Sequence, residues 1–386
     1  MRFPEFTDKW KECELQDIAS ISKGAGISKD QLSDTGEPCI LYGELYTKYK
    51  SEVITDVLSK TNIDTANLVR SKANDVIIPS SGETAIDIST ARCVPFDNIL
   101  LGGDLNILRL KEQDGRFFSY QLNGVRKLDI AQIAQGVSVV HLYGESLKRL
   151  IVRYPSRSEQ QKISSLLASV DERITTQIRI INEIQSLISG ITQAISKHTL
   201  TKMTMLSELL VERNERNIAL YPVYSVSVSE GVINQIDYLG RSFAAADTSH
   251  YNVVHKGDII YTKSPTGEFP FGIVKRNSVE TNVAVSPLYG VYKPVSDDVA
   301  IYLHYYFCSP LNAQNYLHKL IQKGAKNTIN ITNQRFLENH IPLPDKTSLS
   351  RFVELMNAVS AKLKSERSLL EALQRQKKYL LTHMFV

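Results

Sequence analysis

Few residues in this chain have the types and spacing of catalytic groups. The segment Gly24-Ala25-Gly26-Ile27-Ser28-Lys29 is rich in glycine, as phosphate-binding loops are. It lacks the Gly-Lys-Ser/Thr ending of a P-loop and the third glycine of a dinucleotide-binding fingerprint, so it does not predict nucleotide binding. The chain has no Asn-Pro-Pro-Tyr or Asp-Pro-Pro-Tyr tetrapeptide, and an amino-methyltransferase active site is therefore unsupported.

The acidic and histidine side chains have simpler, structural explanations. Asp75 and Asp258 precede apolar strands, as nuclease acids sometimes do, but neither is followed by a Glu-x-Lys pair, and turn formation explains both. His141 has no nearby Ser or Cys nucleophile, and no H-x-x-x-H or H-x-E pattern indicates a metal site. The sequence therefore predicts no catalytic residue, no metal ligand and no cofactor.

Cysteine usage and hydropathy indicate the compartment. Cys13, Cys39, Cys93 and Cys308 are scattered without a C-x-x-C pair, which argues against a zinc knuckle or a disulfide framework and fits a reducing cytosol. No stretch approaches the ~20 apolar residues of a membrane helix. The first ten residues hold four charged side chains and no apolar core of a signal peptide. We therefore expect a soluble, cytoplasmic protein with no membrane contact.

Length and charge bound the number of domains and the kind of surface. The 386 residues suggest two or three domains, at the usual ~150 residues per domain. Lys and Arg number 45 against 41 Asp and Glu, and residues 347–386 account for the whole excess of four positive charges. A nucleic-acid surface elsewhere in the chain would therefore require basic residues gathered on one face.

Two stretches, about 158–197 and 348–385, predict long helices. Each carries residues alternately four and three positions apart in the heptad pattern of a coiled-coil seam. Adding 189 to the first seam gives the second, including a polar break at Gln177 that maps onto Glu366. The predicted seam residues are Ile163, Leu167, Val170, Ile174, Gln177, Ile181 and Ile184, then Phe352, Met356, Val359, Leu363, Glu366, Leu370 and Leu373.

The repeat extends, more weakly, upstream of both helices. Gln135-Gly136 corresponds to Lys323-Gly324, and a short apolar strand with a proline precedes each helix. We therefore expect an α+β fold in each globular part. The predicted segments are a globular domain at 1–157, a spacer helix at 158–202, a second globular domain at 203–346 and a spacer helix at 347–386.

The junction before the first helix resembles a known family. Ile151-Val152-Arg153-Tyr154-Pro155 leads into Ser158-Glu159-Gln160-Gln161-Lys162-Ile163, which is similar to the proline and Glu-Gln-x-Lys-Ile junction of the specificity subunit of type I restriction–modification systems. Asp75-Val76-Ile77-Ile78, the Gln135-Gly136 turn and Ile21-Ser22-Lys23-Gly24 also match. The second junction departs from the pattern, because 345–351 lacks the Glu-Gln-x-Lys-Ile run.

This resemblance implies a non-catalytic subunit with two pseudo-repeated target recognition domains, joined by two long antiparallel coiled-coil helices. Each domain would recognise one part of a split, asymmetric double-stranded DNA target. The helices would act as a spacer and dock two copies of an adenine-N6 methyltransferase subunit, and motor-nuclease restriction subunits would complete the complex. A helix of about 40 residues is ~60 Å long, which exceeds one DNA turn of ~34–36 Å.

Polar and basic side chains in loops are the candidate DNA-binding residues, because such groups reach base edges and phosphates. Any one of the lysines is equally well explained as a solvated surface charge. The loop 323–328 is the strongest single candidate, since it combines two cations, an amide, a hydroxyl and a glycine. The candidates are Lys23, Lys29, Tyr42, Lys48, Lys50, Ser80, Ser81, Thr84, Gln135, Ser138 and His141, then Tyr224, Ser225, Lys263, Ser264, Thr266, Lys323, Lys326, Asn327, Thr328 and Asn330.

The apolar face of the two helices is wider than their seam. Leu166, Ile178, Leu187, Leu355 and Leu369 flank the seam, and a two-helix coiled coil would leave much of them uncovered. We expect partner helices to cover them. Buried polar seam residues, here at 177 and 366, can fix register.

Two other functions compete with DNA recognition. The chain could be a coiled-coil scaffold that links two protein- or ligand-binding domains without nucleic acid. A stand-alone nuclease or methyltransferase is disfavoured by the missing motifs. Duplex binding that weakens with salt would separate the first interpretation from the scaffold.

Overall fold

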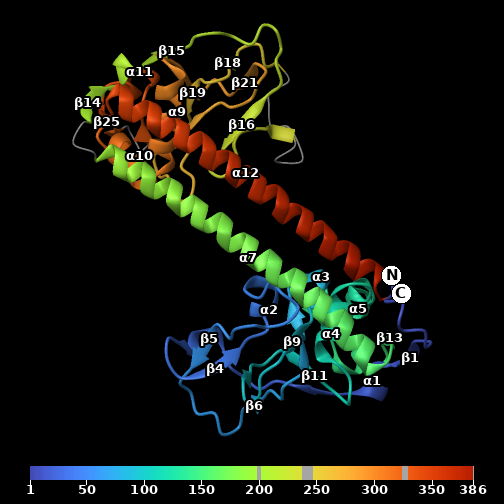
Figure 1. Cartoon of the computed structure of the whole chain (residues 1–386). Coiled ribbons are helices and arrows are strands. Elements are labelled where there is room, and N and C mark those ends of the chain that lie inside the picture. Colours follow the sequence, from blue (N-terminus) through green and yellow to red (C-terminus); the bar gives the residue numbers. More distant parts are fainter. Residues whose placement is uncertain (198–200, 237–246, 324–328, 386) are drawn as a thin grey trace. The chain divides into compact units, whose positions relative to one another are not determined.

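The chain folds as two compact units. Unit 1 comprises Met1–Arg179 with Arg367–Val386, and unit 2 comprises Ile180–Glu366. The computed structural model describes residues 1–197, 201–236, 247–323 and 329–385, with 322, 323, 329 and 330 described by their backbone alone. Two long helices, α7 (Arg157–Ser196) and α12 (Lys346–His383), each contribute one part to either unit (Figure 1).

Unit 1 is built around a four-stranded antiparallel sheet in the order β2-β11-β7-β9. The central strand β7 is apolar on both faces, as a strand buried on both sides must be. Val76 and Ile78 join one core cluster and Ile77 joins another, and all three are fully buried. The four strands are β2 (Ala19–Lys23), β7 (Asp75–Pro79), β9 (Arg92–Val94) and β11 (Leu105–Leu110).

Helix α4 (Gly115–Asn123) covers β7 and β9. It begins at Asp114, whose carboxylate accepts the free backbone N–H groups of the first turn. The other helices of unit 1 are α1 (Leu15–Ile18), η1 (Lys29–Gln31), α2 (Glu44–Thr47), α3 (Ala85–Ile88), α5 (Lys127–Ile133) and α6 (Gly144–Lys148). Its other strands are β1 (Lys11–Glu14) with β13 (Ile151–Tyr154), β8 (Ser81–Gly82) with β12 (Val140–His141), and β3 (Leu32–Ser33), β5 (Ser59–Thr61), β4 (Glu37–Ile40), β10 (Leu100–Leu101) and β6 (Val69–Arg70) in one sheet.

Unit 2 has a four-stranded sheet in the order β15-β22-β19-β20, packed against α9 (Asp297–Cys308). Those strands are β15 (Leu210–Glu212), β22 (Gly290–Pro294), β19 (Ile259–Tyr261) and β20 (Val274–Arg276). The paired strands are β14 (Lys202–Met205) with β25 (His340–Leu343), β16 (Tyr224–Ser227) with β17 (Gly231–Asn234), β18 (Asn252–Val254) with β21 (Val283–Val285), and β23 (Gln322–Lys323) with β24 (Ile329–Asn330). The remaining helices are η2 (Leu206–Glu208), α10 (Pro310–His318) and α11 (Asn333–Phe336).

The two units repeat the same plan. The order β2-β11-β7-β9 matches β15-β22-β19-β20, and β1·β13 matches β14·β25. A shift of 189 residues carries β13 onto β25, β12 onto β24 and the first residue of α7 onto the first residue of α12. The internal repeat predicted from the heptads therefore includes the strand and the turn that lead into each helix.

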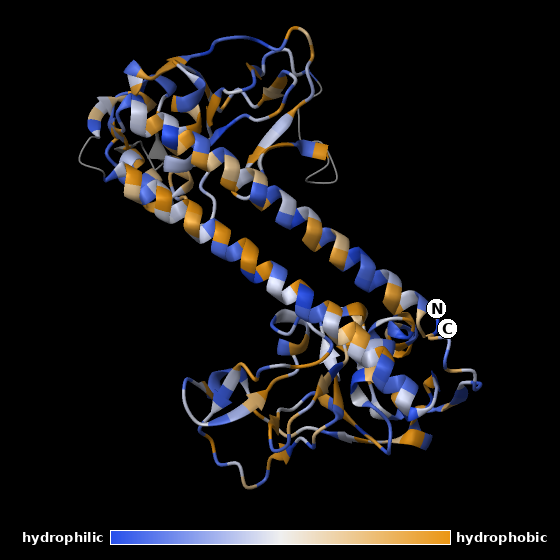
Figure 2. Ribbon diagram, in the orientation of Figure 1, coloured by the Kyte–Doolittle hydropathy of each residue, from blue (hydrophilic) through white to orange (hydrophobic). Residues whose placement is uncertain are grey.

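Each unit contains opposite ends of the two long helices, whose apolar residues recur along the ribbons in Figure 2. In unit 1, Ile163 and Leu167 of α7 share a core with Leu380 of α12. In unit 2, Phe352 and Met356 of α12 share a core with Ile188, Ile191 and Ile195 of α7. All fourteen predicted seam residues are buried or half-buried, and Gln177 and Glu366 are only 5% and 8% exposed.

A buried ionic cluster, here called the Lys377 cluster, fixes the end of α12 within unit 1. The Lys377 ammonium lies 2.6 Å from the Asp171 carboxylate of α7 and also bonds to Glu52. The Tyr120 hydroxyl donates to Asp171 at 2.7 Å, and the Ser51 hydroxyl donates at 3.0 Å. The three ionic side chains are at most 15% exposed, and Lys377 is the cation bonded to both carboxylates. The charge of the buried Arg92 guanidinium also interacts with Glu52 and Asp171.

At the corresponding place in unit 2 the hydrogen bond joins two uncharged hydroxyl groups. Here the Tyr305 hydroxyl bonds to the Ser360 hydroxyl of α12. Adding 189 maps Asp171 onto Ser360, while Lys377 corresponds to Ile188, which packs against the core. The repeat has therefore kept a tyrosine hydroxyl bonded to a long helix while changing the charge around it.

No helix within the described ranges has the length and hydropathy needed to cross a membrane.

Candidate nucleic-acid interface

In unit 1 the chain brings two of the predicted loops together. Strand β8 follows β7 and pairs with β12, so that Ser81 lies opposite His141. The backbone N–H of Leu142 donates to the Ser80 carbonyl at 2.9 Å, and Gln135 and His141 exchange backbone hydrogen bonds of 2.9 and 2.7 Å. The segments 80–84 and 135–141, which are about fifty residues apart in sequence, thus form one continuous edge. We call this edge the β8–β12 edge.

The side chains of the β8–β12 edge differ in exposure. Gln135, Ser138 and His141 are exposed, whereas the side chains of Ser80 and Ser81 are almost fully buried. The His141 ring also stacks on the exposed ring of Tyr143, with 6.2 Å between ring centroids. The edge therefore presents amide, hydroxyl and imidazole groups to solvent, which are the donors and acceptors that can pair with base edges.

Two backbone features shape this edge. Gly136 adopts a φ of +120°, and a Cβ there would lie 2.1 Å from the Val139 carbonyl oxygen, so the turn requires glycine. Thr84 caps α3 by accepting the backbone N–H of Asp87 at 3.1 Å. The Thr84 hydroxyl in turn donates to the Asp87 carboxylate, which leaves that side chain partly committed to the helix end.

A cavity of about 720 Å³ lies beside this edge within unit 1. Lys29, Tyr42 and Lys48 line it, together with Asp104, whose carbonyl accepts the Ser80 N–H at 2.7 Å. The hydrogen bond from Ser80 to Asp104 therefore connects the β8–β12 edge with the cavity that Lys29, Tyr42 and Lys48 line.

The lysines of unit 1 differ in how their charge is balanced. Lys48 donates to Glu44 at 2.6 Å and to Ser59 at 3.0 Å, and Lys50 donates to the Thr47 carbonyl at 3.0 Å. Lys23, at the end of β2, and Lys29 are exposed and have no ion pair or hydrogen bond from the ammonium within the described part of the chain. Lys23 and Lys29 are therefore better suited to meet a phosphate than Lys48.

In unit 2 the predicted residues follow the equivalent strands. Lys263, Ser264 and Thr266 follow β19 as Ser80 follows β7, and a β-bridge joins Thr266 to Phe269. Ser264 and Thr266 are exposed, while Lys263 is half-buried, and this burial lowers the pKa of its ammonium. Tyr224 and Ser225 lie half-buried in β16 of a separate hairpin.

The other candidates of unit 2 lie near the β23·β24 pair. Lys323 and Asn330 are placed by their backbone in these strands, and Lys323 pairs with Ile329. Lys326, Asn327 and Thr328 lie outside the described residues. Strand β24 is the counterpart of β12, so Asn330 falls at the place in the repeat that His141 occupies in unit 1.

Asp75 and Asp258, the two acids that precede apolar strands, each hold a turn, as the sequence indicated. Asp75 forms a two-pronged pair with Arg109 at 2.9 and 2.8 Å and accepts the Lys72 N–H at 2.8 Å. Asp258 makes the same contacts with Arg213, at 2.7 and 3.1 Å, and with the His255 N–H at 2.8 Å. These carboxylates are about 1% exposed, and their hydrogen bonds hold turns.

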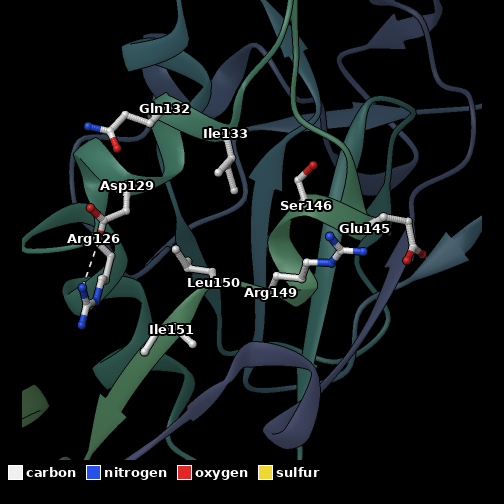
Figure 3. A pocket seen from close by; sticks show the side chains of 9 residues that line it. All are labelled: Arg126, Asp129, Gln132, Ile133, Glu145, Ser146, Arg149, Leu150 and Ile151. Carbon is white, nitrogen blue, oxygen red and sulfur yellow. Dashed lines mark hydrogen bonds and ion pairs between the residues drawn. The ribbon is translucent and has the colours of Figure 1, made fainter.

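A second cavity, of about 600 Å³, was not predicted from the sequence. Figure 3 shows it between α5 and α6, where Arg126 pairs with Asp129 at 2.9 Å. Its residues come from α5, α6, the residues next to these helices and the first residue of β13, Ile151. No sequence motif marks them. The lining is formed by Arg126, Asp129, Gln132, Ile133, Glu145, Ser146, Arg149, Leu150 and Ile151 (Figure 3).

Large apolar side chains remain exposed along the long helices. Ile178 and Leu369, in unit 1, are 40% and 43% exposed, and Leu187 and Leu355, in unit 2, are 53% and 47% exposed. Leu166 is half-buried against the core of unit 1.

No group of three or more metal-ligating side chains occurs within the described residues. The polar contacts described above hold loops and helix ends in place.

Comparison with known proteins relates this chain to one family. Residues 7–186 match the model of the type I restriction modification DNA specificity domain. The S subunit of the type I restriction–modification system of M. genitalium has a similar crystal structure, with a TM-score of 0.62 at 15% sequence identity, and the match covers 100% of this chain and 97% of that one.

A second solved structure, from a study of complex assembly and conformational transition of the type I system, gives a TM-score of 0.56 at 11% identity. That match covers 98% of this chain and 97% of the other. At such low identity the likeness shows a shared fold, and it confirms the α+β fold class with two repeated globular parts and long helices.

Proposed function

We propose that this chain, whose residues 7–186 match the model of the type I restriction modification DNA specificity domain, is a non-catalytic subunit which binds a bipartite, asymmetric duplex target. It directs adenine-N6 methylation and restriction by partner subunits to that target. In this proposal residues 1–157 and 203–346 are the target recognition domains, and 158–202 and 347–386 are the spacer helices.

The repeat of one architecture in two units is the observation that carries the proposal. The sheets share one strand order, and β12 and β24 occupy equivalent places 189 residues apart. Two similar units, each with exposed polar groups in the loop after the equivalent strands β7 and β19, suit a target made of two half-sites. The units differ in the residues of those loops, which is what an asymmetric target requires.

Within unit 1, direct base contacts are assigned to Gln135, Ser138 and His141, because these side chains are exposed on one edge. Lys23 and Lys29 are assigned to phosphates, since their ammonium groups have no partner in the described part of the chain. The burial of Ser80 and the Glu44 pairing of Lys48 favour supporting roles for both in shaping the loop and the cavity.

Within unit 2, direct base contacts are assigned to Ser264 and Thr266 for the same reason, because these side chains are exposed in the loop after β19. The remaining candidates, Tyr224, Ser225, Lys263, Lys323, Lys326, Asn327, Thr328 and Asn330, complete the proposed DNA-binding set of this unit.

The exposed apolar side chains of α7 and α12 support partner docking. Leu187 is 53% exposed and Leu355 47%, and covering such residues with partner helices is favourable at ~25 cal/mol per Å² of apolar surface. We assign this surface to two copies of an adenine-N6 methyltransferase subunit, with motor-nuclease subunits joining the full complex. A solved structure of type I complex assembly shares this fold.

The test is duplex binding by this subunit together with its methyltransferase partner, at several salt concentrations. The logarithm of affinity should fall nearly linearly with the logarithm of salt concentration, and methylation profiling of DNA with the subunit present and deleted should return a split target. Affinity that ignores salt, or no binding with the partner present, would favour the scaffold function instead.

A further inference from the structure

Cys308 lies among cationic and hydrogen-bond-donating groups in unit 2. It is the last residue of α9, and its half-buried side chain faces β20. The Lys275 Nζ of β20 lies 3.3 Å from the Cys308 Sγ, and the His304 Nε2, one helical turn earlier, lies 3.8 Å from it.

The backbone orients the His304 ring. The N–H of Arg276 lies 3.3 Å from the His304 Nδ1, which turns the Nε2 toward the Cys308 sulfur. Cys308 Sγ thus lies between the Lys275 ammonium and the His304 ring, an arrangement that suits a thiolate better than a thiol.

Among the residues that the structure describes, Lys275 has no other anion to pair with. Its side chain is about 4% exposed, and the Cys308 sulfur is its ammonium's hydrogen-bond partner within the described residues. A buried ammonium without a counter-ion is strongly unfavourable. The Asp297 carboxylate is paired with the Arg276 guanidinium, and the Tyr305 hydroxyl bonds to the uncharged Ser360 hydroxyl.

We propose that Cys308 is a thiolate at neutral pH, held as the counter-ion of Lys275, and that it is a modification site for small soft electrophiles. Burial raises the pKa of Cys308, but His304 and Lys275 together outweigh it and lower the pKa to about 6. Burial raises the pKa of Cys39 to about 11 and that of Cys93 to about 12, and it also raises the pKa of Cys13. Cys308 alone among the four cysteines is therefore set to react at neutral pH.

The reaction is a simple displacement. With iodoacetamide, the sulfur forms a bond to the methylene carbon, the carbon–iodine bond breaks, and iodide leaves. With hydrogen peroxide, the sulfur bonds to one oxygen, the oxygen–oxygen bond breaks, and hydroxide leaves; the sulfur is oxidised to a sulfenic acid and the peroxide is reduced.

The test is the rate of iodoacetamide labelling of all four cysteines in the full chain, measured by peptide mass spectrometry between about pH 5 and 9. Cys308 should reach half its maximal rate near pH 6. At pH ~7 it should react at least about 10-fold faster than the half-exposed Cys13. Lys275→Met should raise the midpoint by at least ~1 pH unit, and Lys293→Met, an exposed lysine of the same sheet, should leave it unchanged.

A second measurement does not depend on access to the sulfur or on the folding of the Lys275 variant. The ultraviolet absorbance of the thiolate, taken as the difference between the wild type and Cys308→Ser, should titrate with the same midpoint. A midpoint above about pH 8, as for an ordinary thiol, would overturn the proposal. Labelling of Cys308 no faster than that of buried Cys93 would also overturn it.

Discussion

At the scale of single residues, the Lys377 cluster makes the sharpest stability prediction. Replacing Lys377 by methionine removes the one ammonium group that is bonded to both of the buried carboxylates, Glu52 and Asp171. We expect unfolding in denaturant to show a loss of about 3–5 kcal/mol, as for breaking other buried pairs. Lys378→Met, at the exposed neighbouring position, is the control. Equal stability of the two variants would show that the cluster contributes nothing.

Substitutions of the proposed DNA-binding residues of unit 1 should affect either the affinity for all duplexes or the selectivity for the preferred target. Lys29→Ala should weaken binding to all duplexes alike and reduce the salt slope by about 1, as for a lost phosphate contact. His141→Ala should cost ~1–3 kcal/mol on the preferred target and relax selectivity at one position. Titrations with specific and unrelated duplexes separate the two. Lys148→Ala, whose ammonium pairs with Glu145, should change neither; a loss as large as that of Lys29→Ala would point to nonspecific charge effects.

The low pKa of Cys308 also predicts a pH dependence of stability. Its folded pKa of about 6 lies below the ordinary value of 9.0. A depressed pKa contributes stability that is fully present above the ordinary value and is lost as the pH falls through the folded value. The free energy of unfolding of the wild type, relative to Cys308→Ser, should therefore rise between pH ~6 and ~9. A flat difference over that range would contradict the thiolate.

At the scale of elements, the helices and buried strands could be predicted, and the short edge strands could not. The heptads fixed α7 and α12 because a seam of forty residues repeats one signal many times. The aspartate and apolar run at 75–78 likewise indicated β7. Strands β8 and β12 have two residues each and exist only because they pair with each other across the fold. No local sequence pattern predicts such pairs. The sequence therefore indicated Ser81 and His141 separately and could not show that they lie opposite one another.

The exposed apolar surface of α7 supports a docking prediction. Replacing Ile178 and Leu187 by aspartate should abolish co-purification with the methyltransferase subunit, because charged groups would be buried at the contact. Thermal stability should change little, since both side chains are at least 40% exposed in the chain alone. Gln193→Asp, an exposed polar position of the same helix, should retain the partner. Retention by the double variant as well would move the docking surface elsewhere.

The polar break in the seam is a separate question of register. Gln177 and Glu366 are almost fully buried, and buried polar seam groups can specify one pairing. The double change to leucine should alter the spacing between half-sites or the oligomeric state, measured by methylation profiling and sedimentation. Unchanged spacing and oligomeric state would remove the register role.

At the scale of the whole molecule, the repeat predicts separable recognition. Replacing residues 1–157 by the equivalent segment of another specificity subunit should change one part of the target and leave the other intact, as read by methylation profiling. This follows because unit 1 and unit 2 have their own cores and their own candidate loops. A change in both parts would show that the recognition domains are not independent. The target bases themselves do not follow from sequence or fold, because base selection depends on the docked geometry of a few side chains.

The two units of the repeat differ in the contacts of one buried tyrosine. Tyr120 meets an acid and a lysine where Tyr305 meets a serine, with an isoleucine at the place of the lysine. A second copy of α7 in place of α12 would bring Ile188 to the position of Lys377 and remove the ammonium bonded to Asp171 and Glu52. Unit 1 therefore favours α12 over a second α7 at this position. A chain with the same architecture repeated in two units can in this way keep the two units distinct, as recognition of an asymmetric target requires.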